Sequence, residues 1–303
     1  MPPYTADTAD NVLEHVTSLY DSVRTVRPLV LHLTNIVVVN DQANITLALG
    51  GSPIMSLAAE EQELLSPMVS ALLLNIGTIH RAQRETMLIA AKQAGRHGKP
   101  IILDPVGVAL GGYRAEVVQD ILDNSIPAVI TGNAAEIGYL ARLDASAKGV
   151  DSIADLKDPV RVVRDLAKQT GSVIVLHGEI DYVSDGETVV QLSNGHVDLS
   201  KVTGTGCSTG SAIATFVGVA LDGIDLNPRG LEKSAADERN IRRRIFAGSV
   251  AGVLATSLAG ELAVEASANH GTASFKAAWI GSIGRLTGEI IKSRAKVVIR
   301  YDQ

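Results

Sequence analysis

The residues of this chain best suited to chemistry lie in a glycine-rich turn that feeds an apolar helical segment, Thr203-Gly204-Thr205-Gly206-Cys207. Two glycines allow a tight turn and a close approach of the backbone to a ligand. The free N–H groups and the positive dipole end of the following helix would face an anion, such as a phosphoryl group in transfer. A glycine-rich turn can also serve packing alone. We predict catalytic roles for Gly204, Thr205 and Gly206.

Cys207, the only cysteine in the sequence, stands at the start of that predicted helix. A helix N-terminus lowers the pKa of a thiol, so Cys207 could act as a base near an acceptor hydroxyl or line the acceptor's site. The alternative is a small buried hydrophobic residue. The neighbouring glycine turn favours a catalytic role.

Two more turns follow predicted strands and carry acidic side chains. In Gly132-Asn133-Ala134-Ala135-Glu136, Asn133 and Glu136 face the same side of a helical turn. They could hold a hydrated Mg²⁺ against a nucleotide, or they could simply cap the helix. Asp104, which ends a strand before Pro105, could bind the same metal or begin an ordinary turn. Asp104 and Glu136 are therefore candidate metal ligands.

A fourth polar region combines Thr34-Asn35-Ile36-Val37 with Gly50-Gly51-Ser52-Pro53-Ile54-Met55. Its turns offer polar groups together with a flexible, apolar Met55, which suits a small heteroaromatic ligand. Burial of Met55 in the core is the alternative.

Short apolar runs alternate with amphipathic segments, which predicts βαβ units and a largely parallel sheet with helices on both faces. The helical example is Gln83–Gly95, where Gly95 is expected to end the helix. The carboxyl ends of parallel strands are where open α/β sheets bind ligands, and the four turns lie there. The predicted strands are Leu29–Leu33, Ala71–Ile76, Pro100–Leu103, Ala128–Thr131 and Val173–Leu176.

The second half of the chain has a different pattern. Tyr182–Val190 alternates around Asp-Gly and predicts a hairpin. From Cys207 onward the pattern is nearly all helical until Lys296–Ile299, and Ser249–Val264 is expected to be a buried helix. We expect residues 222–244 to form a charged surface excursion within a single domain that spans residues 1–303.

Composition narrows the possible functions. The chain has 303 residues, of which 46% are hydrophobic and 3% aromatic, so a large aliphatic core is expected. Its 27 basic and 33 acidic residues give a net charge of −6, which argues against nucleic acid as a partner. One cysteine precludes an intrachain disulfide. We expect a soluble, cytoplasmic protein with no membrane partner.

The ordered set of motifs closely resembles the hydroxyethylthiazole kinase family of the ribokinase-like superfamily, over about Pro28 to Leu286. The matching motifs are His32–Asn35, Gly51–Met55, Leu74–Thr78, Leu103–Gly107, Gly132–Ile137, Gly178–Asp181 and Val202–Cys207. The resemblance implies a ribokinase-like three-layer α/β/α fold with a mostly parallel central sheet. It also implies a homotrimer with active sites between subunits, and phosphorylation of 5-(2-hydroxyethyl)-4-methylthiazole by ATP and Mg²⁺ in thiamine salvage.

Carried over residue by residue, the resemblance implies that the thiazole contacts Asn35, Val37, Met55 and Gly204. It assigns Mg²⁺ to Asp104 and Glu136, and the nucleotide to Thr131, Asn133, Glu136 and His177. Cys207 stands where most ribokinase-like kinases carry an aspartate base, and thiazole kinases commonly have Cys there.

The sequence departs from the family's pattern at the nucleotide end. Thr131 replaces an Arg, and His177 replaces a Thr. Loss of the Arg removes a charged fork that can clamp phosphate, and a protonated His177 could partly replace it. Asp41-Gln42-Ala43-Asn44 replaces Phe-Thr-Ala-Asn.

Three other functions compete with this prediction. They are a kinase of another acceptor such as a hydroxymethylpyrimidine, a nucleotide-dependent dehydratase of hydrated NAD(P)H, and a non-catalytic thiazole-binding relative. Cys207 argues against the first two, and the retained Asp104 and Glu136 argue against the third. If the transition state is loose, a strong base contributes little, so we expect Cys207→Ser to keep more activity than Glu136→Ala.

Overall fold

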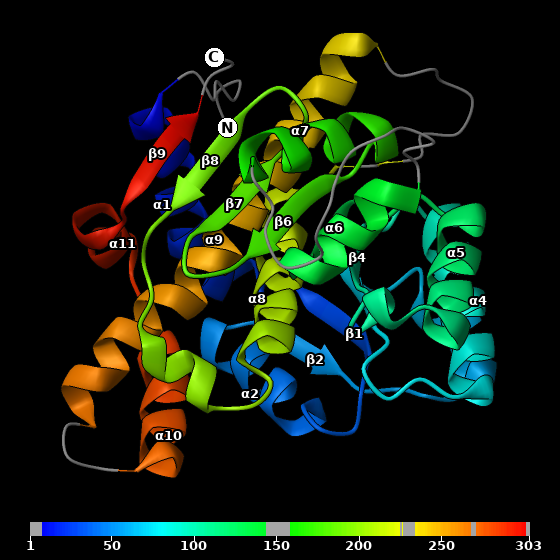
Figure 1. The fold of residues 1–303 in the computed structure, drawn as a ribbon, viewed down its shortest axis with the longest axis horizontal. Coiled ribbons are helices and arrows are strands. Elements are labelled where there is room, and N and C mark those ends of the chain that lie inside the picture. Colours follow the sequence, from blue (N-terminus) through cyan, green and yellow to red (C-terminus); the bar gives the residue numbers. More distant parts are fainter. Residues whose placement is uncertain (1–7, 144–157, 225, 227–233, 268–270, 301–303) are drawn as a thin grey trace.

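The computed structural model describes residues 8–143, 158–224, 226, 234–267 and 271–300, and is built around a nine-stranded sheet (Figure 1). The sheet order is β2-β1-β3-β4-β5-β6-β7-β8-β9. Strands from β2 to β6 pair in parallel, and the last four strands of the order pair antiparallel. The strands are β1 Leu29–Leu33, β2 Ser52–Ile54, β3 Ala71–Asn75, β4 Ile101–Asp104, β5 Val129–Asn133, β6 Val173–His177, β7 Asp181–Ser184, β8 Val189–Leu192 and β9 Val297–Arg300.

Helices cover both faces of this sheet and complete three layers (Figure 1). One apolar core lies under α1, α2, α8, α9 and α10, and the other lies under α4, α5, α6 and α7. The α-helices are α1 Ala9–Val26, α2 Val39–Leu49, α3 Gln62–Leu65, α4 Arg81–Arg96, α5 Gly112–Asn124, α6 Ala134–Leu143, α7 Pro159–Thr170, α8 Thr205–Ala220, α9 Ala235–Ala266, α10 Thr272–Ile283 and α11 Gly288–Arg294. The 3₁₀ helices are η1 Ala59–Glu61, η2 Val108–Leu110 and η3 Val197–Lys201.

The sequence predicted the main strands correctly. All five predicted strands and the hairpin of β7 and β8 are present, because each strand is an apolar run buried on both faces of the sheet. The prediction missed β2, whose three residues are only half-buried at the sheet edge. Gly95 does not end α4, which continues to Arg96, and the left-handed glycine after it is Gly98.

Helix α9 corrects part of the expected surface excursion. Residues 235–244 are the first turns of α9, which Ser234 begins with a capping box to Asp237. The remainder of that predicted excursion falls largely outside the described residues. Ser249–Val264 is the buried core of the helix, as predicted. By length and composition α9 could cross a membrane, but 89% of its apolar window is buried inside the protein.

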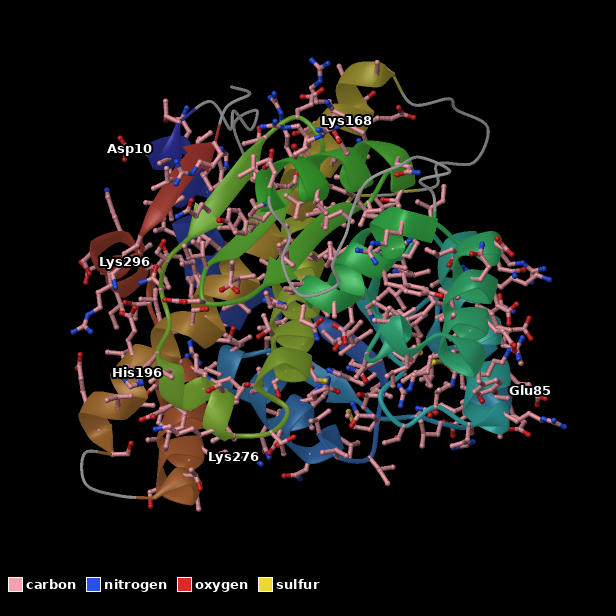
Figure 2. The ribbon with its side chains drawn as sticks, in the orientation of Figure 1. Asp10, Glu85, Lys168, His196, Lys276 and Lys296 are labelled. Carbon is pink, nitrogen blue, oxygen red and sulfur yellow. The ribbon has the colours of Figure 1, made fainter. Side chains whose placement is uncertain are left out.

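Close packing of α8 on α9 fixes the start of α8 relative to the sheet. A Cβ at Gly252 would lie 2.5 Å from the backbone N of Ile213, and one at Gly248 would lie 2.9 Å from that of Val217. The two helices therefore meet backbone to backbone. Asp10, Glu85 and Lys168, labelled in Figure 2, are examples of charged side chains exposed on the outside of the fold.

Candidate active site at the carboxyl ends of the strands

The glycine turn has the geometry of an anion-binding helix start. Gly204 is the N-cap of α8 with φ +87°, and a Cβ there would collide with Val38. The first intrahelical bond runs from Ser208 N to Gly204 O at 2.9 Å, so the amides of Thr205, Gly206 and Cys207 have no partner within the helix. The Thr205 hydroxyl donates to Leu199 O at 3.0 Å, which turns that side chain back onto η3.

Cys207 is a protonated thiol and not the activated one that its helix position suggested. Burial, followed by the charge of Asp104, raises the pKa of Cys207 to about 12. Desolvation of the thiolate therefore outweighs the helix dipole, and the predicted lowering of this pKa is wrong. Gln42 Nε2 donates to Cys207 O at 2.8 Å and ties α2 to the first turn of α8.

Asp104 lies beside Cys207 at the end of β4. Burial, followed by the charge of Glu136, raises the pKa of Asp104 to about 7, against hydrogen bonds from Cys207 and Asn75 that lower it. Asn75 Nδ2 donates to Asp104 Oδ2 at 2.5 Å. Two buried carboxylates that repel each other in this way form an arrangement that a cation would stabilise.

Asn133 and Glu136 cap α6, as the alternative interpretation expected. Asn133 Oδ1 accepts from Ala135 N at 2.9 Å and from Glu136 N at 3.0 Å. Glu136 Oε2 accepts from Asn133 N at 2.8 Å, and its Oε1 accepts from Gly107 N at 2.8 Å. Glu136 thus joins the loop after β4 to the start of α6.

The two residues that depart from the family's pattern contact each other. Thr131 Oγ1 lies 2.7 Å from His177 Nε2, and His177 Nδ1 lies 3.4 Å from Asp181 Oδ1. Burial acts to lower the pKa of His177, but Asp181, Asp104 and Glu136 outweigh it and raise that pKa overall. Asp181 also accepts from Gly178 N at 3.1 Å and from Ser257 Oγ at 3.3 Å, which links the β6–β7 turn to α9.

A cavity of about 890 Å³ adjoins these groups. It runs from the β6–β7 turn, with His177 and Asp181, past η3 to Thr205 and Gly206 of α8 and Trp279 of α10. Thr131 is buried behind His177 and does not line the cavity. The volume is ample for a nucleotide.

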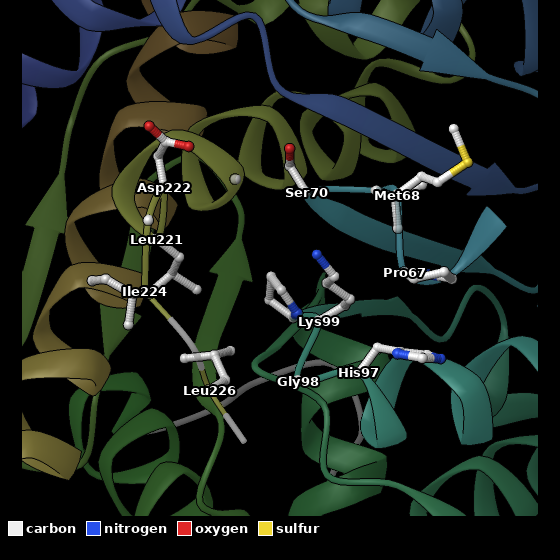
Figure 3. A pocket seen from close by; sticks show the side chains of 14 residues that line it. Pro67, Met68, Ser70, His97, Gly98, Lys99, Leu221, Asp222, Ile224 and Leu226 are labelled. Carbon is white, nitrogen blue, oxygen red and sulfur yellow. The ribbon is translucent and has the colours of Figure 1, made fainter. Parts of the chain in front are cut away.

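Another cavity, of about 510 Å³, opens at the amino ends of the strands (Figure 3). Ser70 and Pro100, which precede β3 and β4, line it with Lys99 and Asp222. Its described lining has a single carboxylate, Asp222, and no glycine-capped helix start, so the candidate chemistry lies at the carboxyl ends of the strands.

The predicted thiazole contacts lie in the loops after β1 and β2. Asn35 is buried, and its Nδ2 lies 3.8 Å from Cys207 Sγ. Val37 is 56% exposed, and Met55 is half-buried, so Met55 is not the core residue of the alternative interpretation. Asn35 is therefore the one of these three side chains that contacts the start of α8, while Val37 is open to solvent.

The sequence did not reveal several residues that hold the site together. Arg114 of α5 donates to the carbonyls of Ile76, Gly77 and Val106 at 2.6 to 2.8 Å and so clamps the loops after β3 and β4. Asn75 and Asp181 stood within quoted motifs without a role. An asparagine that closes an apolar strand was the one available signal for Asn75.

A glycine-capped helix, a buried carboxylate pair and a large cavity lie together at the carboxyl ends of the strands in this three-layer fold, which is where open α/β proteins bind their ligands. Residues 20–289 match the model of the hydroxyethylthiazole kinase family. The chain is 38% identical to a hydroxyethylthiazole kinase of Ruminiclostridium cellulolyticum, over 94% of this chain and 97% of the relative. The chain belongs to the hydroxyethylthiazole kinase family.

Solved structures agree with that assignment. The structure of a hydroxyethylthiazole kinase protein from Pyrococcus horikoshii OT3 is 30% identical and superposes with a TM-score of 0.80, over 95% of this chain and all of that chain. A ribokinase-like superfamily protein from Enterococcus faecalis V583 is 14% identical with a TM-score of 0.56, over 88% of this chain and 90% of that one, and it supports the fold alone. The predicted ribokinase-like α/β fold is confirmed.

Proposed function

We propose that this protein transfers the γ-phosphoryl group of ATP to the hydroxyl of 5-(2-hydroxyethyl)-4-methylthiazole in thiamine salvage. Family membership supports the reaction, and one structural observation carries the proposal. The first turn of α8 separates two regions: Cys207 faces Asn35 and Asp104, whereas Thr205 and Gly206 line the large cavity. An acceptor on one side and a nucleotide on the other would meet at the free amides of that turn.

On the acceptor side, the thiazole would lie against Asn35, Val37 and Met55 with its hydroxyl near Gly204 and Cys207. Asn35 Oδ1 accepts from Val37 N at 3.0 Å, so this loop is preorganised. A small ring needs an apolar wall and few polar contacts, which Val37 and Met55 with Asn35 provide.

On the donor side, the nucleotide would occupy the large cavity and extend its phosphates toward the amides of Gly204, Thr205, Gly206 and Cys207. Asn133, in register with His177, and Glu136 would contact the nucleotide from the end of β5 and the start of α6. His177 would replace an arginine as the polar contact, with Thr131 behind it holding the imidazole. A raised pKa keeps more positive charge on His177, which favours phosphate binding.

The carboxylates of Asp104 and Glu136 fit a magnesium ion. They are buried hard-oxygen groups, and burial, followed by the charge of Glu136, raises the pKa of Asp104. Within the described residues, no group of three or more His, Cys, Asp or Glu is placed to hold a metal. Magnesium commonly takes one or two carboxylates and completes its shell with water and phosphate. When bound, it would neutralise the donor's phosphates.

In the reaction, the substrate oxygen would form a bond to the γ-phosphorus as the bond to the ADP oxygen breaks. The amides at the start of α8 would stabilise the charge on the transferring group. In a loose transition state the hydroxyl proton leaves late, so a thiol with a pKa of about 12 need not act as a base.

We also propose a homotrimer with active sites between subunits. Five exposed apolar side chains lie on α2 or in the loops after β1 and β2, a surface that we call the α2 apolar surface: Ile36, Val37, Val39, Leu47 and Leu57. Exposed apolar surface that is contiguous is typical of interaction sites. A second copy there would cover the open thiazole contacts. A cytoplasmic location agrees with the free thiol of Cys207.

The direct test incubates the purified protein with Mg²⁺, the thiazole alcohol and ATP, GTP, CTP or ADP, and detects phosphorylated thiazole by mass. A parallel arm offers a hydroxymethylpyrimidine. We expect phosphorylated thiazole with ATP, and none from Glu136→Ala above about a hundredth of the wild-type rate. Ser172→Ala, which removes a buried hydrogen bond near the amino ends of β5 and β6, controls for lost stability.

Two of the alternative functions have their own outcomes in this assay. Thiazole binding without product from any donor would identify a non-catalytic binding protein. Phosphorylation of the pyrimidine in preference to the thiazole would identify a kinase of another acceptor.

A further inference from the structure

Asn75 is the last residue of β3 and is fully buried. Strand β3 lies between β1 and β4, and Asn75 is in register with Asp104 of β4. The loop that carries Asn35 begins just after the end of β1 on the other side. The topology thus places the Asn75 amide between the proposed thiazole loop and the proposed metal ligand.

Both ends of the Asn75 side-chain amide form hydrogen bonds with residues of the site. Asn75 Oδ1 accepts from Asn35 Nδ2 at 2.7 Å and from Gly77 N at 2.9 Å. Asn75 Nδ2 donates to Asp104 Oδ2 at 2.5 Å. Only one orientation of the amide satisfies these partners, because a flipped group would set like groups against each other at both ends.

The chain of contacts continues beyond Asn35 to the surface of the site. Asn35 Oδ1 accepts from Val37 N, and a Cβ at Gly77 would lie 2.5 Å from Asn35 Nδ2. The glycine therefore lets the Asn35 amide pack flat against the loop after β3. Hydrogen bonds thus connect Val37 through Asn35 and Asn75 to Asp104, across the ends of three adjacent strands.

We propose that Asn75 is a positioning residue that couples the acceptor loop to the metal carboxylate of the site. Its carbonyl end holds Asn35 for the acceptor, and its amino end fixes the orientation of Asp104. Outer hydrogen-bond partners of metal-binding carboxylates commonly change metal affinity or activity 10- to 100-fold when they are removed. This inference rests on the proposed function and adds a residue to it.

The two ends of the amide can be tested separately. Asn75→Asp keeps the shape and the acceptor toward Asn35 but puts an oxygen in place of the donor toward Asp104. Asn35→Ala removes the acceptor arm and leaves the contact between Asn75 and Asp104. Ser172→Ala controls for a lost buried hydrogen bond, because its hydroxyl donates to Pro127 O at 2.7 Å far from the site.

The readouts are kcat, KM for the thiazole, the Mg²⁺ concentration for half-maximal activity, and the rise in melting temperature that the thiazole causes without nucleotide. For Asn75→Asp we expect kcat to fall by about 10- to 100-fold and the Mg²⁺ concentration for half-maximal activity to shift. The rise in melting temperature that the thiazole causes should be retained. For Asn35→Ala we expect a higher thiazole KM and a smaller rise, with the Mg²⁺ requirement unchanged. Ser172→Ala should lower the melting temperature alone.

The inference is overturned if Asn75→Asp keeps kcat and the Mg²⁺ requirement within threefold of wild type. The inference is also overturned if the loss of activity in Asn75→Asp only follows a lowered melting temperature, as in Ser172→Ala. If the wild-type protein phosphorylates no thiazole, the proposed function fails. The thiazole-induced rise in melting temperature still decides the acceptor arm in that event, because Asn75→Ala should reduce it as Asn35→Ala does, and a full rise in Asn75→Ala would refute that arm.

Discussion

Thr131 Oγ1 and His177 Nε2 lie 2.7 Å apart across β5 and β6, so these two residues, which we propose to lie at the nucleotide end of the site, are one structural unit. Asp181 holds the far side of the imidazole, 3.4 Å from Nδ1. A substitution at one position of such a contact leaves the other without its partner. Thr131 in place of an Arg and His177 in place of a Thr are therefore best understood as a paired change.

This contact predicts strong coupling between the two positions. Thr131→Arg alone would bury a guanidinium against an imidazole whose pKa nearby carboxylates raise, so the two groups repel each other, and we expect a higher KM for ATP and a lower melting temperature. His177→Thr alone should raise the same KM by about 10-fold. The double variant Thr131→Arg/His177→Thr removes the repulsion, so we expect it to recover most of both losses.

A double-mutant cycle on KM for ATP and on unfolding free energy measures this coupling, which should be about 1 to 3 kcal/mol. Independent, additive effects of the two substitutions would show that the contact has no role in the nucleotide site.

The state of Cys207 predicts the ranking of two active-site variants. With a pKa of about 12 the thiol stays protonated at neutral pH, so Cys207→Ser exchanges one neutral hydrogen-bonding group for another. We expect its kcat to stay within about tenfold of wild type, whereas Glu136→Ala should lose more than about 100-fold. Steady-state kinetics with matched melting curves would decide, and an inactive but folded Cys207→Ser would reverse the ranking.

The parts of the fold that the sequence predicted are those buried from both sides. Strands β1, β3, β4, β5 and β6 consist of continuous apolar runs, which only a sheet between two helical layers explains. Strand β2 was missed because a half-buried, three-residue edge strand has no such pattern. The sequence placed residues 235–244 in a charged surface excursion and did not join them to the buried helix, because they lack its apolar pattern and begin at a capping box of Ser234 and Asp237.

The residues of the candidate site also divide into those that the sequence predicted and those that it did not. The glycine turn and the acidic residues were predictable because their types mark strand ends and helix starts. The contact between Thr131 and His177 was not, since 46 residues separate them and only the register of β5 with β6 joins them. The pKa of Cys207 was predicted in the wrong direction because burial is a tertiary property.

The α2 apolar surface predicts that assembly and activity are lost together. Leu47 is 57% exposed, so Leu47→Glu should leave the folded subunit intact while placing a charge in the proposed interface. We expect monomers by light scattering and a large loss of thiazole affinity. Ile126→Glu, at an exposed position of the opposite sheet edge, should change neither. A Leu47→Glu variant that assembles normally would show that this surface is not the interface.

Buried His32 predicts how stability depends on pH. Its ring lies near Val30 O at 3.1 Å and Thr46 Oγ1 at 3.3 Å, and burial lowers its pKa from 6.5 to about 4. Below pH 6.5 His32 binds a proton in the unfolded chain, but in the folded chain it stays neutral down to about pH 4. Stability should therefore fall as pH decreases from about 6.5 to about 4, by a limit on the order of 3 kcal/mol, and then level off.

The measurement is the difference in unfolding free energy between wild type and His32→Gln, from urea denaturation at fixed protein concentration between pH 4.5 and 7.5. Taking the difference cancels shared groups such as Asp104, whose raised pKa acts in the opposite direction. Wild type should lose stability relative to His32→Gln as pH falls, whereas replacing exposed His97 with Gln should give a nearly constant difference. A difference for His32→Gln that does not change with pH would mean that His32 takes up its proton equally in both states.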